Sequence, residues 1–130
     1  MIEQEINEYE DIYKENVLDH YKNPHNFGEL ENSSLSARES NPLCGDKIEL
    51  FLKVECGKVK DVKFRGQGCA ISMASASMLT DKIKGMSLDE IKSLTDKNII
   101  EMIGINLNIV RIKCGLLSLK TLLKALQEKK

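Results

Sequence analysis

The alternating segment from Lys47 to Val54 constrains the fold of this chain most strongly. Apolar residues fill every second position of the segment, at Ile48, Leu50, Leu52 and Val54. Such alternation is typical of a β-strand that buries one face. Cys56-Gly57 then predicts a tight turn into a second strand over 58–65. A β-bulge is expected in that second strand, because strict alternation is broken among its apolar residues Val59, Val62 and Phe64.

A helical pattern precedes this hairpin. In residues 2–21, apolar side chains recur every three or four positions among charged ones, which predicts an amphipathic helix. The helix should end at Asn23, because a residue that precedes a proline disfavours the helical conformation. Residues 22–43 contain both prolines together with glycine, asparagine and serine, so they predict a loop with one short strand near residues 35–40.

After Gly66 the pattern becomes helical again. Apolar residues between Ile71 and Ile83 form one stripe, and alanines beside it allow close approach to another element. Gly85 is expected to close this helix. Ser87 and the glutamate three residues after it have the form of a capping box, which predicts a short helix through residue 94.

Two more helices complete the pattern. One is expected to start at residue 95 or 96 and to stop at Gly104, and residues 114–130 predict a last amphipathic helix rich in leucine. The order of helix, strands and helices indicates an α+β fold. We expect a small antiparallel sheet of about three strands packed against helices, in a single domain over residues 1–130.

Charge and composition exclude several classes of function. The 19 basic and 20 acidic residues are well mixed and give a net charge of −1, so no basic face is expected for nucleic acid. No run approaches the roughly 18 apolar residues of a membrane span, and the N-terminal residues lack the pattern of a leader, so a cytoplasmic protein is expected. In a reducing compartment, the four cysteines are expected to bind metal or react rather than pair.

Three cysteines and one aspartate lie at the edges of expected elements: Cys44, Asp46, Cys69 and Cys114. Gly45 lets the chain turn sharply, so that the side chains on either side of it can point at one cation. Cys69 and Cys114 are both expected at helix N-termini, where the helix dipole stabilises a thiolate. Together these residues suggest a metal site, and a set with one carboxylate holds zinc or iron less tightly than four thiolates.

Each of these residues also has a structural explanation, as a turn residue or as core filler. The spacing is not that of a zinc finger, because 24 residues separate Cys44 from Cys69 and 44 separate Cys69 from Cys114. Cys56 is not expected to be a ligand, since a strand of about eight residues places it roughly 26 Å away. His20 and His25 are expected to pack or to lie at the surface.

A second chemical interpretation takes Gln67-Gly68-Cys69 as a nucleophile motif of a cysteine peptidase, with a histidine as base. Both histidines precede Cys69, which is opposite to the papain-like order. Neither histidine has neighbours in the sequence that would orient it as a base. This interpretation is therefore disfavoured.

The motifs resemble the U-type iron-sulfur cluster assembly proteins, which comprise IscU, SufU and the N-terminal module of NifU. Four segments carry the resemblance in the same order along nearly the whole chain: 17–24, 41–46, 66–72 and 111–114. It implies an α+β fold in which the three cysteines and Asp46 converge at one exposed end. It also implies a cysteine desulfurase as the partner that delivers persulfide sulfur.

The residue before the last cysteine divides this family. IscU-like members have histidine there and SufU-like members have lysine or arginine, so Lys113 resembles SufU. The interval of 44 residues between Cys69 and Cys114 matches IscU and NifU instead, because it has no room for the insertion usual in SufU. Residues 107–110 also lack the Leu-Pro-Pro-Val-Lys run by which IscU engages its DnaK-type chaperone, which argues against that partnership.

The resemblance implies a scaffold or carrier that accepts sulfur at Cys44 or Cys114. The expected ligands of iron, of a labile [2Fe-2S] cluster or of zinc are Cys44, Asp46, Cys69 and Cys114, with apo-proteins as acceptors. Lys113 is expected to give electrostatic support. The alternative is a zinc-dependent sulfurtransferase, which would make the protein an enzyme, and a third hypothesis is a zinc that is purely structural.

Overall fold

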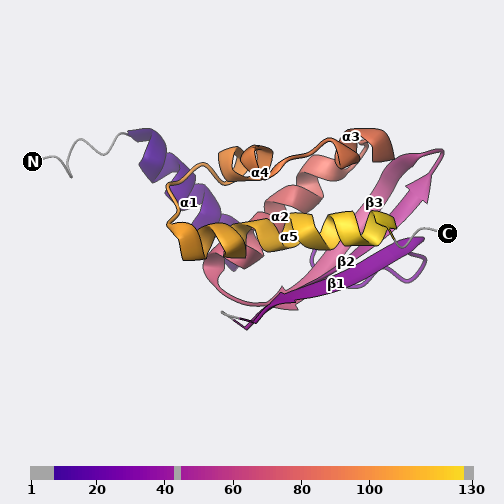
Figure 1. Cartoon of the computed structure of the whole chain (residues 1–130), viewed down its shortest axis with the longest axis horizontal. Coiled ribbons are helices and arrows are strands. Elements are labelled where there is room, and N and C mark those ends of the chain that lie inside the picture. Colours follow the sequence, from indigo (N-terminus) through magenta and orange to yellow (C-terminus); the bar gives the residue numbers. More distant parts are fainter. Residues whose placement is uncertain (1–7, 43–44, 128–130) are drawn as a thin grey trace, which may run out of the picture.

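A three-stranded antiparallel sheet in the order β1-β2-β3 forms the base of the molecule (Figure 1). The computed structural model describes residues 8–42 and 45–127. The strands are β1 (Leu35–Asn41), β2 (Asp46–Glu55) and β3 (Lys58–Gln67). The helices are α1 (Glu8–Lys22), α2 (Ala70–Ile83), α3 (Leu88–Lys92), α4 (Asp96–Ile103) and α5 (Ile109–Gln127). The predicted α+β class is confirmed.

Both links within the sheet are short. Cys56 and Gly57 join β2 to β3 with φ of 54° and 75°, the left-handed pair that a tight hairpin turn requires. Lys53 pairs with Asp61 and Val54 pairs with Val59, so Lys60 is an extra residue of β3 and the bulge predicted in the second strand is confirmed. At the other end of β2, Asn41 pairs with Asp46 across the link from β1. Gly45 and Asp46 therefore lie at this end of the sheet.

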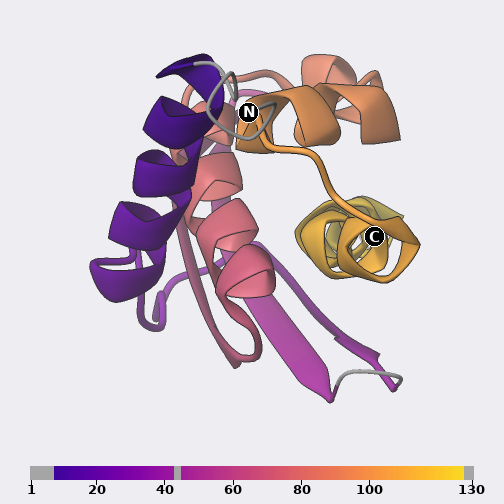
Figure 2. The same ribbon diagram turned by 90° about the vertical axis from the view of Figure 1, so that its left-hand side faces the viewer.

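Helices cover one face of the sheet (Figure 1). α5 packs on β1 and β2, and α2 packs on β3 and on α5. Figure 2 shows α1 lying alongside α2, with α5 seen end-on to the other side of α2. Residues 71–80 of α2 are consequently all buried, which explains their many alanines and serines.

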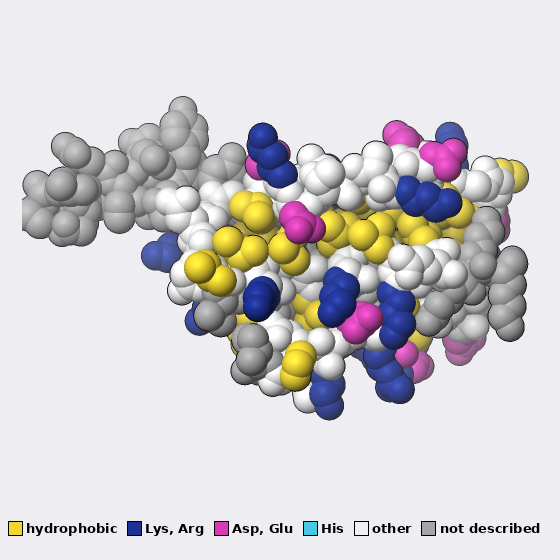
Figure 3. Space-filling model, in the orientation of Figure 1, with side chains coloured by type: hydrophobic (Ala, Val, Ile, Leu, Met, Phe, Trp, Pro, Cys, Tyr) yellow, Lys and Arg dark blue, Asp and Glu magenta, His cyan; other side chains and the backbone are white. Residues whose placement is uncertain are grey.

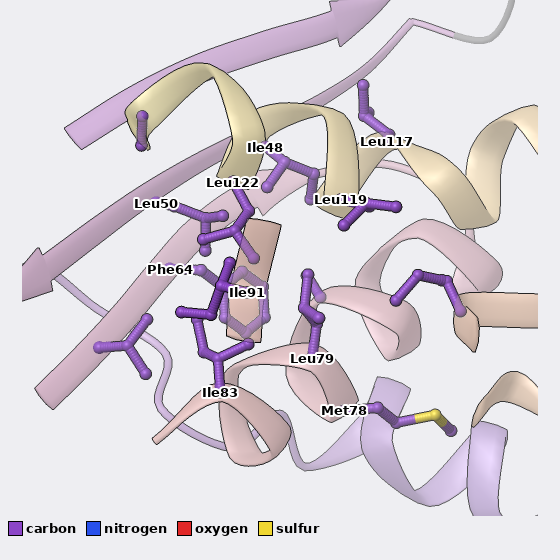
Figure 4. Close-up of a cluster of buried hydrophobic side chains, with 14 of the residues drawn as sticks. Ile48, Leu50, Phe64, Met78, Leu79, Ile83, Ile91, Leu117, Leu119 and Leu122 are labelled. Carbon is purple, nitrogen blue, oxygen red and sulfur yellow. The ribbon is translucent and has the colours of Figure 1, made fainter. Parts of the chain in front are cut away.

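The core lies where the sheet, α2, α3 and α5 meet (Figure 4). Alternate residues of β2 and β3 point into it, as the period of the sequence predicts. Its largest fully buried side chains include Phe64, Ile48, Leu50, Leu79, Ile83, Ile91 and Leu122. Truncation of one such leucine or isoleucine to alanine typically costs about 2–5 kcal/mol of unfolding free energy.

Most predicted helix boundaries are confirmed. α1 ends at Lys22, and its predicted first residues lie outside the described part of the chain. Capping boxes begin α3 at Ser87 and α4 at Thr95, and Gly104 ends α4 with φ of 80°. Among the described residues, no helix is long and apolar enough to cross a membrane.

The predicted start of the last helix at Cys114 is wrong. α5 begins at Ile109, where the Asn108 side chain accepts a hydrogen bond of 2.9 Å from the backbone N–H of Arg111. An asparagine in this position is a favourable N-terminal cap. Cys114 therefore lies inside the helix, more than one turn from its start.

Candidate metal centre

Residues from three elements meet at the N-terminal end of α2. Asp46 is the first residue of β2, Cys69 is the N-cap of α2, and Cys114 lies in α5. One ligand atom from each lies within 4.8 Å of the other two. We call these three residues the thiolate centre. The sequence predicted these three as candidate ligands, and the fold brings them together.

Asp46 is held by hydrogen bonds from the first turn of α2. The backbone N–H of Cys69 donates to Oδ1 over 3.0 Å, and the Ser72 hydroxyl donates to Oδ2 over 2.5 Å. The side chain is only 1% exposed. Burial alone would raise the pKa of Asp46, but the hydrogen bonds from Ser72 and Cys69 outweigh it and lower the pKa. An ionised carboxylate therefore faces the two thiols.

Gly68 makes room for this carboxylate. A Cβ atom at this position would lie 2.5 Å from Oδ1 of Asp46 and 2.8 Å from its Cγ. Real Cβ atoms do not approach other atoms so closely, so any larger residue would displace Asp46. Neither Gly68 nor Ser72 was predicted to shape the site. The available signal was their position, one residue before and three residues after Cys69 at the start of a helix.

The two described cysteines of the centre differ in their surroundings. Cys69 is partly exposed at the helix start, as predicted, with its Sγ 3.7 Å from Oδ2 of Asp46. Cys114 is 1% exposed. Because α5 begins at Ile109, the expected stabilisation of a Cys114 thiolate by a helix N-terminus is wrong.

Cys44 lies outside the described residues, so its place as a fourth ligand stays a prediction. Gly45, the residue after it, lies in a turn that ends at β2. Gly45 has φ of 73°, and its N–H donates to the Asn41 carbonyl over 2.8 Å. The chain then enters β2 at Asp46.

Lys113 is exposed and lines a groove between the end of β1 and α5. Asn41, Pro42, Leu116 and Lys120 share this groove. Basic side chains lie beside a band of hydrophobic ones on the face that carries α5 (Figure 3). Lys113 therefore adds positive charge to the groove beside Asn41 and Pro42, and its support of the thiolate centre stays a prediction.

The remaining cysteine and the histidines lie elsewhere. Cys56 is exposed in the β2–β3 turn, at the opposite end of β2 from Asp46. His20 lies in α1, and His25 follows that helix. Both histidines contact the last turns of α2, far from Cys69.

The donor set of the thiolate centre suits a thiophilic metal. Zinc and iron both accept thiolate sulfur together with a carboxylate oxygen. The oxygen is the harder and weaker partner for such metals. The residues present therefore fit zinc or iron held less firmly than by cysteine alone.

Comparison with known proteins places this geometry in a family. The chain is 41% identical over 130 residues to the zinc-dependent sulfurtransferase SufU of Bacillus subtilis, covering 87% of this chain and 88% of that protein. It is 40% identical over 134 residues to the iron-sulfur cluster assembly scaffold protein IscU of Thermotoga maritima, covering 90% of this chain and 94% of that protein.

A solved structure shares the fold. The crystal structure of the SUF-system protein FiSufU from Fervidobacterium islandicum AW-1 superposes with a TM-score of 0.75 at 31% identity. The match covers 89% of this chain and 97% of that one. Residues 12–130 match the model of the NifU-like N terminal domain. The relatives include both SufU and IscU proteins. Because the match to this domain spans nearly the whole chain, the chain belongs to the NifU-like N-terminal domain family.

Proposed function

We propose that this protein is a scaffold or carrier of iron-sulfur cluster assembly. It receives sulfur from a cysteine desulfurase, holds iron or a labile [2Fe-2S] cluster on Cys44, Asp46, Cys69 and Cys114, and passes the cluster to apo-proteins in the cytoplasm. One observation carries the proposal: ligand atoms of Asp46, Cys69 and Cys114 lie within 4.8 Å of one another, although the residues are far apart in sequence.

Sulfur acceptance is a thiol exchange. A cysteine thiolate attacks the terminal sulfur of the persulfide on the desulfurase, a new S–S bond forms, and the old S–S bond breaks as the desulfurase cysteine leaves as a thiolate. Conversion of this sulfur to the sulfide of a cluster then needs iron(II) and an electron donor. Two cysteines were predicted as sulfur acceptors, Cys44 and Cys114. Because Cys114 is buried, Cys44 is the better candidate for the first acceptor.

Asp46 keeps the bound cluster labile. Its carboxylate is the one hard donor of the proposed set, and it is already engaged by Ser72 and by the N–H of Cys69. These hydrogen bonds fix its position, and its bond to a thiophilic metal is weaker than that of a thiolate. A cluster held in this way is suited to release.

A zinc-dependent sulfurtransferase is the second candidate. Lys113 favours it, together with the likeness to the Bacillus subtilis relative of that name. Zinc on the thiolate centre would keep its cysteines deprotonated until one of them attacks the persulfide. The short interval between Cys69 and Cys114 argues against this candidate.

Desulfurase turnover separates the two candidates. The release of alanine from cysteine is measured with the cognate desulfurase and increasing amounts of zinc-loaded protein. A large, saturable acceleration that disappears in Cys44→Ser, but not in the control Cys56→Ser, establishes the sulfurtransferase. Absence of acceleration, together with cluster formation on iron-loaded protein and transfer to an apo-ferredoxin, establishes the scaffold. If neither activity appears, both proposals fail.

A purely structural zinc is tested by metal removal. The core is built from the sheet, α2, α3 and α5 without metal, so the chain should remain folded when a chelator removes all zinc. Circular dichroism with and without chelator measures this. Loss of helical signal on chelation would support the structural zinc instead.

A further inference from the structure

A second cluster of metal-binding side chains lies at the opposite end of α2. His20, His25 and Asp81 each offer one ligand atom, and these atoms lie within 4.8 Å of one another. We call these residues the imidazole cluster. Asp81 follows Cys69 by 12 residues, which corresponds to about 18 Å along a helix. The imidazole cluster is therefore separate from the thiolate centre.

Ser77 of α2 holds both histidines in place. Its Oγ lies 2.7 Å from Nδ1 of His20 and accepts the backbone N–H of His25 over 2.8 Å. The two imidazole rings are in contact, with centroids 4.4 Å apart and planes tilted by 47°. Ser77 is fully buried, so it fixes α1 and the loop after it relative to α2.

Asp81 is positioned in the same manner. Its Oδ1 accepts a hydrogen bond of 2.8 Å from the Asn26 side chain, which also donates to Thr80 over 3.0 Å. Its Oδ2 lies 2.5 Å from Nδ1 of His25. The donors of the imidazole cluster are thus oriented by Ser77 and Asn26, as the ligands of metal sites commonly are by their neighbours.

We propose that the imidazole cluster is a second cation site, which binds zinc or another divalent first-row metal that prefers imidazole. Two imidazoles and one carboxylate are a donor set that such metals accept. Three protein ligands leave a position for water, as in open zinc sites. The site would join α1, the loop after it and α2 through one ion.

The cluster has room for the ion. The side chains of His25 and Asp81 are 46% and 45% exposed, so they can separate and an ion can reach them. Two ligand atoms on one zinc lie about 3.3 Å apart, so the gap between His25 Nδ1 and Asp81 Oδ2 must widen by roughly 0.8 Å. His20 is 8% exposed and closes the inner side. His25 Nδ1 and Asp81 Oδ2 are hydrogen-bonded to each other where the ion would bind.

Histidine resonances provide the most direct test. The sequence contains two histidines, and both belong to the imidazole cluster, so every imidazole signal of untagged protein reports on this site. Zinc is added beyond the amount that fills the thiolate centre, while proton–carbon correlation spectra of the rings are recorded. Saturable shifts of both rings are expected. Unchanged rings at excess zinc would overturn the proposal without any need for a variant.

Variants then identify the ligands. Calorimetric titration should show one more zinc equivalent on the parent protein than on His25→Gln or Asp81→Asn. Asp19→Asn is the matched control, because it removes an exposed negative charge beside His20 without removing a donor. It should retain the second equivalent. A second equivalent that persists in His25→Gln and Asp81→Asn, or that disappears in Asp19→Asn as well, would show general attraction of cations to this surface instead.

Cobalt distinguishes the two sites by their chemistry. Cobalt on the thiolate centre gives thiolate-to-metal charge-transfer absorption, whereas cobalt on nitrogen and oxygen ligands does not. The equivalent lost in His25→Gln should therefore lack the charge-transfer band. If that equivalent carries the band, the ion sits on cysteine and the proposed site does not exist.

Discussion

The two ends of α2 carry donor sets of opposite character. At the start of the helix, the thiolate centre combines sulfur with one carboxylate, and Asp46 and Cys114 are buried while Cys69 is partly exposed. Near its end, the imidazole cluster combines nitrogen with one carboxylate and is open to solvent on one side. The centre joins α2 to β2 and α5, whereas the cluster joins α2 to α1. One buried helix thus presents soft donors at one end and borderline donors at the other.

The two carboxyl groups, in contrast, behave alike. Burial alone would raise the pKa of both, yet hydrogen bonds lower it in each case. For Asp46 these come mainly from Ser72 and the N–H of Cys69, and for Asp81 from His25 and Asn26. The carboxylate is therefore common to both sites, and the sulfur or nitrogen beside it decides which metal is preferred.

The largest effect is expected from Gly68→Ala. The new Cβ would force apart Asp46 and the segment that carries Cys69, so both ligands would lose their relative position and zinc affinity at the thiolate centre should fall about 10–100-fold, the range typical of a lost orienting contact. The free energy of unfolding should fall by about 1–3 kcal/mol. Zinc titration and denaturant unfolding measure the two quantities.

Gly85→Ala is the control for this substitution at the other end of α2. Nothing lies within 4 Å of a Cβ atom there, although φ of 85° strains the backbone. A stability loss of about 1 kcal/mol without any change in metal affinity is expected. Equal affinity losses in Gly68→Ala and Gly85→Ala would mean that the helix as a whole, rather than Asp46, holds the centre.

Asp46→Ala should slow cluster release about tenfold, which corresponds to an increase of about 1.4 kcal/mol in the activation free energy of release. The cluster would then rest on cysteines alone, which are better partners for iron. The rate of cluster transfer to an apo-ferredoxin checks this. Asp81→Asn, at the other end of the helix, should transfer at the parent rate. Parent-like transfer by Asp46→Ala would remove the proposed role of the aspartate.

Ser72→Ala and Ser77→Ala sharpen the comparison in a crossed design. Both hydroxyls are buried in α2 and hydrogen-bonded, so each loss should cost about 1–3 kcal/mol of unfolding free energy. Ser72→Ala should weaken metal binding at the thiolate centre and leave the histidine resonances unchanged. Ser77→Ala should do the reverse. If each variant disturbs both sites equally, the two ends of α2 are not independent.

The smallest effect is expected from Lys113→Ala. Loss of an exposed charge next to the thiolate centre should slow sulfur acceptance about two- to fivefold, the range that about 0.5–1 kcal/mol implies. Desulfurase assays at low and high salt measure it, and the difference should shrink in high salt. Lys120 lines the same groove, and Lys120→Ala should slow sulfur acceptance less than Lys113→Ala does. If both variants slow sulfur acceptance equally, the positive charge of the groove as a whole attracts the desulfurase and Lys113 has no special role.

Local patterns predicted most of the fold. The alternation over Lys47–Val54, the Cys56-Gly57 turn and the capping box at Ser87 all depend on neighbours in sequence, and each is present in the structure. The start of α5 was missed because its first residues are mostly β-branched, which resembles a loop or strand more than a helix. The cap at Asn108 was the available signal.

Long-range contacts could not be predicted from local patterns. The motifs indicated the members of the thiolate centre, but the need for Gly68 and Ser72 follows from where the fold places Asp46. The imidazole cluster was missed entirely, since His25 and Asp81 are 56 residues apart and meet only because α1 lies against α2. His20 is buried and His25 is exposed, in line with the prediction that they pack or lie at the surface. Their contacts with Ser77 and Asp81 were not predicted.

Cluster assembly on the cysteine variants tests the central claim most directly. Each variant is incubated anaerobically with iron(II), cysteine, an electron donor and a desulfurase, and the bound cluster is measured by Mössbauer spectroscopy. Cys56→Ser should assemble a [2Fe-2S] cluster to the parent level, whereas Cys44→Ser, Cys69→Ser and Cys114→Ser should each lose it. A full cluster on Cys69→Ser or Cys114→Ser, or its loss on Cys56→Ser, would contradict the assignment of the site.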